Sequence, residues 1–123
     1  MTDEHLFSVE EANALLPDLR RSLVAVQKAR QVVLSGGERV RRSASANGGG
    51  RQGQLYWEAL GALRREVEAI TARGIVLRDA DTGLLDFPTR REGTEAFLCW
   101  RLGEDRVEYW HGPDTGLAGR QPL

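Results

Sequence analysis

The sequence predicts an α+β fold in which an antiparallel two-helix hairpin packs on a small four-stranded antiparallel β-meander. Two long segments, 8–35 and 54–73, repeat apolar residues at spacings of four and three, which is typical of helices that bury one face. Segment 74–111 instead alternates apolar and polar residues between short polar turns, which is typical of strands. A segment rich in glycine and serine, 36–53, separates the two helical patterns and predicts a flexible linker.

Chain length, net charge and cysteine content exclude several kinds of protein. The 123 residues are enough for a single domain over 1–123, and a net charge of −1 gives no basic field for nucleic acid. No stretch approaches the roughly 20 apolar residues of a membrane span, and the acidic start does not resemble a signal peptide. A single cysteine fits a reducing compartment. We therefore expect a cytoplasmic protein that binds neither nucleic acid nor membranes.

The first helix is expected over 8–35. Ser8 and Glu11 have the spacing of a capping box, in which each side chain satisfies the backbone amide of the other residue. Pro17 removes one hydrogen bond from the helix, so the sequence predicts either a kink near this residue or a new helix start there. Gly36 and Gly37 predict the end of the helix.

The second helix, 54–73, has a matching apolar seam and ends before Gly74. Two helices joined by one linker make an antiparallel hairpin, but they leave apolar side chains such as Val24, Leu34 and Trp57 uncovered. These side chains must meet the sheet or another molecule. The helices are therefore expected to bind a second copy of the chain, as a homodimer, or another protein.

The meander over 74–111 is expected to contain four strands. The first two follow Gly74 and end at a turn and at Pro88, and the last two form a hairpin over 95–102 and 107–111. Pairing Leu102 with Val107 sets Arg101 against Glu108, an opposite-charge pair. The tail, 112–123, is too rich in glycine and proline to predict an element.

In this register Cys99 and His111 point to opposite faces of the hairpin, because side chains alternate along a strand. The pair therefore cannot share a metal ion without a bulge. The sequence also has no paired ligand motif such as C-x-x-C or H-x-x-x-H. We expect no metal site, and His111, Glu104 and Cys99 remain only weak candidates for one.

Three motifs resemble one known family. They are F-S-V-E-E-A-N-A-L-L-P, D-A-D-T-G-L-L-D-F-P and L-C-W-R-L-G-E-D-R-V-E-Y-W-H-G-P-D-T-G-L-A-G-R, and their order is similar to that in the prokaryotic family catalogued as domain of unknown function 2203. The resemblance covers nearly the whole chain apart from the linker and implies no activity. It implies that the important positions are Glu11, Asn13, Pro17, Asp86, Phe87, Pro88, Arg91, Cys99, Trp100, Gly103, Glu104, Trp110, His111, Gly116, Gly119 and Arg120.

Polar and aromatic side chains gather at one end of the predicted sheet. The candidates for ligand binding are Asp86, Arg91, Trp100, Glu104, Trp110, His111 and Arg120. Arginine suits a carboxylate or phosphate ligand, but Arg120 has an alternative role as the partner of Asp86 or Glu104 in a salt bridge that holds the tail. No catalytic residue and no cofactor can be assigned.

Two classes of function remain after these arguments. The first is a non-enzymatic interaction protein that acts through its helical hairpin. The second is a domain that binds a small ligand or a metal, with or without enzymatic activity, around Trp100, Glu104, His111 and Arg120. The spare apolar surface of the helices favours the first class, and the cluster at the end of the sheet favours the second.

Overall fold

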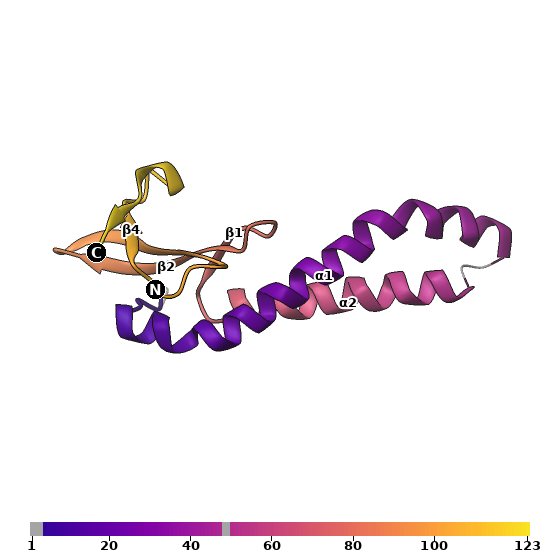
Figure 1. Cartoon of the computed structure of the whole chain (residues 1–123), viewed down its shortest axis with the longest axis horizontal. Helices are drawn as coiled ribbons and strands as arrows, with labels where there is room; N and C mark the ends of the chain where they lie inside the picture. Colours follow the sequence, from indigo (N-terminus) through magenta and orange to yellow (C-terminus); the bar gives the residue numbers. More distant parts are fainter. Residues whose placement is uncertain (1–3, 48–49) are drawn as a thin grey trace.

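The computed structural model describes residues 4–47 and 50–123, and it has two packed helices followed by a five-stranded antiparallel open sheet. The sheet order follows the chain, and the two helices extend away to one side of the sheet (Figure 1). The elements are α1 (Val9–Asn47), α2 (Gly50–Thr71), β1 (Val76–Asp79), β2 (Leu84–Arg91), β3 (Thr94–Arg101), β4 (Tyr109–His111), the 3₁₀ helix η1 (Leu117–Gly119) and β5 (Gln121–Pro122). The predicted α+β class is confirmed, and the sheet has one strand more than expected.

The additional strand comes from the predicted tail. Residues 112–123 were expected to hold no element, and this is wrong, because η1 and β5 both lie there. Gln121 pairs with Trp110, and the backbone amide of Leu123 donates to the carbonyl of Glu108 at 2.9 Å. These hydrogen bonds satisfy backbone groups that would otherwise be exposed at the edge of β4, and they stabilise the tail as a strand.

The predicted linker is also wrong over most of its length. Residues 36–47 belong to α1 and residues 50–53 belong to α2, whereas 48–49 lie outside the described residues. A Cβ atom at Gly37 would lie 3.4 Å from Tyr56 Cε1, an ordinary van der Waals contact, so α2 packs against α1 at this position. Packing between the helices therefore outweighs the low helix propensity of glycine. No helix in the described part of the chain is long and apolar enough to cross a membrane.

The start of α1 is capped by Ser8, whose Oγ accepts a hydrogen bond from the Glu11 amide at 3.0 Å. The Glu11 carboxylate contacts the ring of His5 at 2.6 Å, so the second half of the predicted capping box is not made. The helix passes through Pro17 without a break, and a new start at this residue is therefore wrong.

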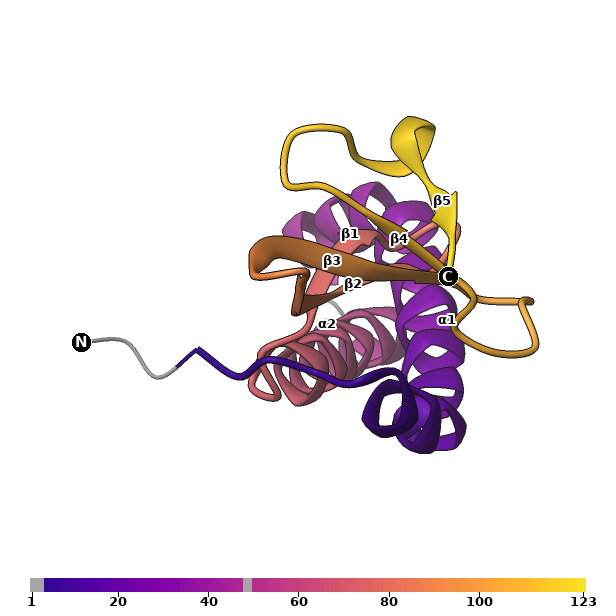
Figure 2. The same ribbon diagram turned by 90° about the vertical axis from the view of Figure 1, so that its left-hand side faces the viewer.

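The core lies between the first half of α1, the end of α2 and one face of the sheet (Figure 2). Its central members are Leu16, Leu19, Leu23, Ile70, Leu85, Phe87, Leu98 and Trp100, all of them buried. On the strands these residues alternate with side chains that point away from the helices. β2 continues through Pro88 to Arg91 and is not ended by the proline as expected, and the amide of Phe7 donates to the Pro88 carbonyl at 2.8 Å.

The register between β3 and β4 differs from the prediction by one residue. Cys99 pairs with Tyr109, Leu98 with Trp110 and Phe97 with His111. The reason lies in the segment between the strands, where Val107 is buried in the core and its amide donates to Asn13 Oδ1 at 2.7 Å. Val107 is thereby taken out of the ladder by α1, and β4 begins at Tyr109. A shift of one residue moves each side chain of a strand to the other face relative to its neighbours.

Candidate functional site

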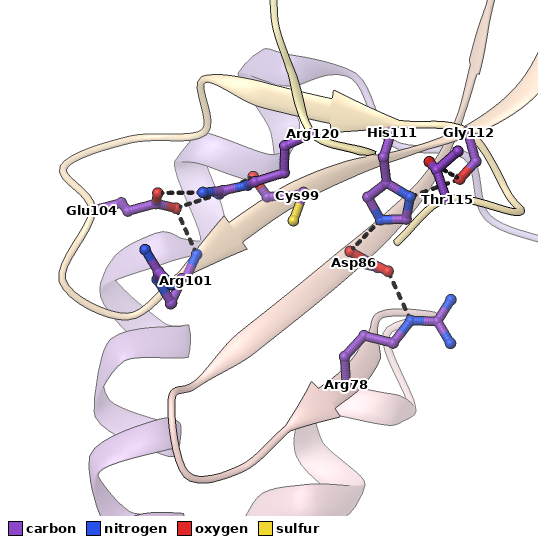
Figure 3. Close-up of polar contacts among 9 residues, drawn as sticks. All are labelled: Arg78, Asp86, Cys99, Arg101, Glu104, His111, Gly112, Thr115 and Arg120. Atoms are coloured by element: carbon purple, nitrogen blue, oxygen red, sulfur yellow. Dashed lines mark hydrogen bonds and ion pairs between the residues drawn. The ribbon is translucent and has the colours of Figure 1, made fainter. Parts of the chain in front are cut away.

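The corrected register brings Asp86, Cys99 and His111 together on the face of the sheet that points away from the helices (Figure 3). Asp86 pairs with Cys99 across β2 and β3, and His111 lies on β4 beside them. One potential ligand atom from each residue lies within 4.8 Å of the other two. The exposed fractions are 2% for Asp86, 0% for Cys99 and 2% for His111, so the cluster is almost completely buried.

The hydrogen bond made by Nδ1 of His111 shows which nitrogen of the ring carries a proton. Nδ1 lies 2.7 Å from the Gly112 carbonyl oxygen, which can only accept, so Nδ1 carries a proton and donates it. Nε2 then faces Asp86 Oδ1 at 3.0 Å. This distance is short enough for an ion pair, yet Asp86 Oδ1 has no well-aligned hydrogen-bond partner among the described residues. If the ring were neutral, the lone pair of His111 Nε2 would face a lone pair of Asp86 Oδ1, and the two atoms would repel each other.

The thiol of Cys99 completes the cluster. Burial raises the pKa of the Cys99 thiol to about 11, the cation of Arg120 opposes this shift, and the negative charge of Asp86 adds to it. A buried thiol of this kind stays protonated at neutral pH and is a poor nucleophile. It becomes a thiolate readily only when a cation replaces its proton, so the raised pKa argues against nucleophilic catalysis and is compatible with a ligand role.

Arg78 on β1 orients the carboxylate of Asp86. Its Nε donates to Asp86 Oδ2 at 2.7 Å, and its Cζ lies 5.2 Å from the centre of the Phe97 ring. One carboxylate oxygen is therefore held by Arg78, and the other is turned toward His111. Side chains in the second layer of metal sites commonly fix ligands in this manner.

The tail covers the cluster and is held by Arg120. Both Nη atoms of Arg120 donate to the carboxylate of Glu104, at 2.7 Å and 2.8 Å, and Nη2 also donates to the Cys99 carbonyl at 3.3 Å. The guanidinium lies 4.2 Å from the centre of the Tyr109 ring. The expected salt bridge that holds the tail is thus formed, and Glu104 is its acid.

Glu104 is an ionised partner in this arrangement. Burial opposes its ionisation, but hydrogen bonds from Arg120 and from the Arg101 amide, together with both arginine charges, lower the pKa of Glu104 below its ordinary 4.5. This contribution to stability is present above the ordinary pKa and is lost as the pH falls through the lowered one. Glu104 lies outside the cluster of Asp86, Cys99 and His111 found among the described residues.

The remaining candidates lie on the opposite face of the sheet. Trp100 is 0% exposed in the core, and Trp110 packs against the same core. The guanidinium of Arg91 lies 4.7 Å from the centre of the Trp110 ring, as expected for a cation–π contact that helps to cover it. The structure therefore brings Asp86, His111 and Cys99 together. It places Glu104 and Arg120 beside this cluster. Trp100, Trp110 and Arg91 lie apart from it, on the other face of the sheet.

Sequence reasoning missed Arg78, although a signal was present. Val76 pairs with Asp86 across β1 and β2, so alternation places Arg78 on the same face as Asp86. Pairing the two short apolar runs on either side of the turn at 79–83 would have placed an arginine beside that acid.

Comparison with known proteins assigns the chain to one family. A family model described as "Uncharacterized conserved protein (DUF2203)" matches residues 5–123. No curated protein and no solved structure matches the chain.

Proposed function

As this chain belongs to the DUF2203 family of uncharacterised conserved proteins, its function has to come from its own residues, and we propose that it binds one Zn²⁺ ion through Asp86, Cys99 and His111. Carboxylate oxygen, thiolate sulfur and imidazole nitrogen are all ligands that zinc accepts. The three side chains come from three adjacent strands, which hold them more firmly than a loop would.

The observation that carries the proposal is the pair of buried atoms, His111 Nε2 and Asp86 Oδ1, that face each other at 3.0 Å. Gly112 fixes the proton of the ring on Nδ1, and Arg78 holds the other oxygen of Asp86. A buried acceptor without a partner costs about 1–3 kcal/mol, so this arrangement calls for a positive species between the two atoms. Cys99 beside them supplies the sulfur that distinguishes a zinc site from a simple ion pair.

The separations are close to those of a coordination sphere. Bonds of about 2.0–2.3 Å in a tetrahedron put neighbouring ligand atoms about 3.3–3.7 Å apart. The nitrogen and oxygen are already within that reach, and the largest separation in the cluster is no more than 4.8 Å. A movement of about 1 Å by one side chain would bring all three ligand atoms to bonding distance from one ion.

Native mass spectrometry of zinc-supplemented protein tests the proposal. The wild-type chain is expected to retain one Zn²⁺ and His111→Ala to retain none, because three ligands become two. Glu104→Gln is the matched control, since it removes a charge near the cluster but no ligand, and it is expected to retain the ion. A wild-type mass without zinc, or equal zinc in the wild type and His111→Ala, would contradict the proposal.

A second function is favoured by the outer part of the helical hairpin, here called the arm (α1 from residue 24, and α2 up to residue 67). The arm extends beyond the sheet (Figure 1), and among its described side chains the large exposed apolar ones are Val24, Val32, Leu34, Leu55 and Trp57. The seam residues Tyr56, Leu60, Leu63 and Val67 of α2 are only half-buried by α1. We infer that the arm packs against a second copy of itself to form a four-helix bundle.

The dimensions of the arm support a second copy as its partner. At 1.5 Å per residue, positions 24–47 span about 36 Å, and two helices side by side are about 20 Å wide. One face of the arm therefore offers about 700 Å² per copy, close to the roughly 800 Å² per partner of stable complexes. Two identical hairpins also present equal lengths of apolar seam to each other.

Sedimentation velocity tests the dimer. The wild-type protein is expected to sediment as a dimer at micromolar concentration, and Trp57→Glu as a monomer with unchanged circular dichroism, because Trp57 is 64% exposed in the single chain. Leu123→Glu is the control, since Leu123 is exposed but lies outside the arm. A monomeric wild-type protein, or a dimeric Trp57→Glu variant, would contradict the inference.

A further inference from the structure

A cavity of about 370 Å³ opens beside the cluster on the outer face of the sheet. Its lining includes two of the three proposed zinc ligands, Asp86 and His111, together with Arg78 from β1. The tail forms the opposite wall through residues 113–117. A space of this size is at the small end of ligand pockets and would take a molecule of up to about a dozen heavy atoms.

The proposed centre leaves room for one more ligand. Only three potential ligand residues gather in the cluster among the described residues, and zinc takes four ligands in most protein sites. Sites with three protein ligands keep the fourth position for water or substrate. Since Asp86 and His111 both reach the cavity, an ion held between them lies at its wall.

Arg78 gives the cavity a second positive group. Its Nε is occupied by Asp86 Oδ2 at 2.7 Å, which fixes the plane of the guanidinium. Neither Nη atom has a hydrogen bond to any residue in the described ranges, and the side chain is 44% exposed. An arginine held in place by one nitrogen and free at two others is prepared to bind an oxygen-containing anion.

We propose that this cavity binds a small monocarboxylate, with one carboxylate oxygen on the open position of the zinc ion and the other hydrogen-bonded to the Nη atoms of Arg78. The proposal rests on the proposed zinc function. A planar carboxylate matches the arginine fork, and its single charge suits a cavity whose lining also includes Asp114, which repels a more highly charged anion. Leu84 and Leu117 line the same space and leave an apolar wall for the short carbon chain of the ligand.

Cobalt(II) loading followed by visible absorption tests the inference, because the d–d bands of Co²⁺ respond to a change of ligand. Acetate is the probe, and the protein is kept saturated with Co²⁺ throughout. The wild-type spectrum is expected to change with acetate and to saturate. In Arg78→Gln the acetate concentration for half-saturation is expected to rise by about tenfold or more, which corresponds to the loss of one charged, bidentate contact. Arg78→Lys keeps the charge without the fork and is expected to lie between the two.

Arg90→Gln serves as the control, because Arg90 is an exposed arginine that does not line this cavity. A cobalt spectrum that ignores acetate, or an equal response in wild type and Arg78→Gln, overturns the carboxylate site while leaving the zinc proposal standing. Tighter binding of inorganic phosphate than of acetate overturns the assignment to a monocarboxylate. A wild-type protein that takes up no Co²⁺ overturns the proposed function and this inference together.

Discussion

Zinc is expected to raise the melting temperature of the wild-type protein strongly and to leave that of Cys99→Ala nearly unchanged. At free zinc one hundred times the dissociation constant, binding to the folded state alone adds about 2.7 kcal/mol to the free energy of unfolding. For a chain of this length the corresponding rise in Tm is roughly 10 °C. Cys99→Ala removes the sulfur ligand with little loss of packing, because cysteine is a small side chain. Differential scanning calorimetry with and without zinc gives both values.

The sign of the pH dependence provides a second readout of the same experiment. Because burial raises the pKa of the Cys99 thiol to about 11, the thiol is protonated in the metal-free protein at neutral pH. Zinc has to displace at least this proton, so its affinity is expected to rise by about tenfold or more per pH unit across the neutral range. Glu104→Gln is the control and should keep the zinc-dependent rise in Tm. An equal rise in the wild type and Cys99→Ala would show that zinc binds elsewhere.

Trp100→Ala is expected to lower the free energy of unfolding by about 3–5 kcal/mol, the usual cost of removing a large buried aromatic side chain. Trp100 is 0% exposed, and its Nε1 donates to the Glu104 carbonyl at 3.1 Å. Chemical denaturation followed by circular dichroism measures the change. Natural domains are stable by only about 5–15 kcal/mol, so the alanine variant can lose its fold.

Trp100→Phe keeps this prediction testable, because it retains most of the apolar volume and loses only the second ring and the Nε1 hydrogen bond. We expect a loss of about 1–2 kcal/mol for this variant, with zinc binding unchanged. Trp100 lies on the helix-facing side of the sheet, opposite Asp86, Cys99 and His111. Loss of zinc in Trp100→Phe, or a cost for Trp100→Ala as small as that of a surface change, would contradict the placement of this residue in the core.

The periodicity of the sequence determined the two helices and the antiparallel sheet. Apolar spacing is a local property, and each helix or strand carries its own copy of it, so Leu16, Leu19 and Leu23 are buried as the pattern predicts. The same holds for Leu98 and Trp100, which alternate with polar or outward-facing neighbours along β3. The sequence also predicted the salt bridge of Arg120 with Glu104, as one of two alternatives for the acidic partner.

Only the tertiary structure decided the length of the helices and the composition of the site. α1 continues through Gly37, where Tyr56 of the other helix packs, and no local pattern contains that contact. The register of β4 depends on α1, where Asn13 binds the Val107 amide and removes this residue from the ladder. Strand register has a period of two, so that single distant hydrogen bond decides whether His111 faces Cys99 or the core. The three proposed zinc ligands could therefore be named from the sequence, but their meeting on one face depends on contacts between segments more than ninety positions apart.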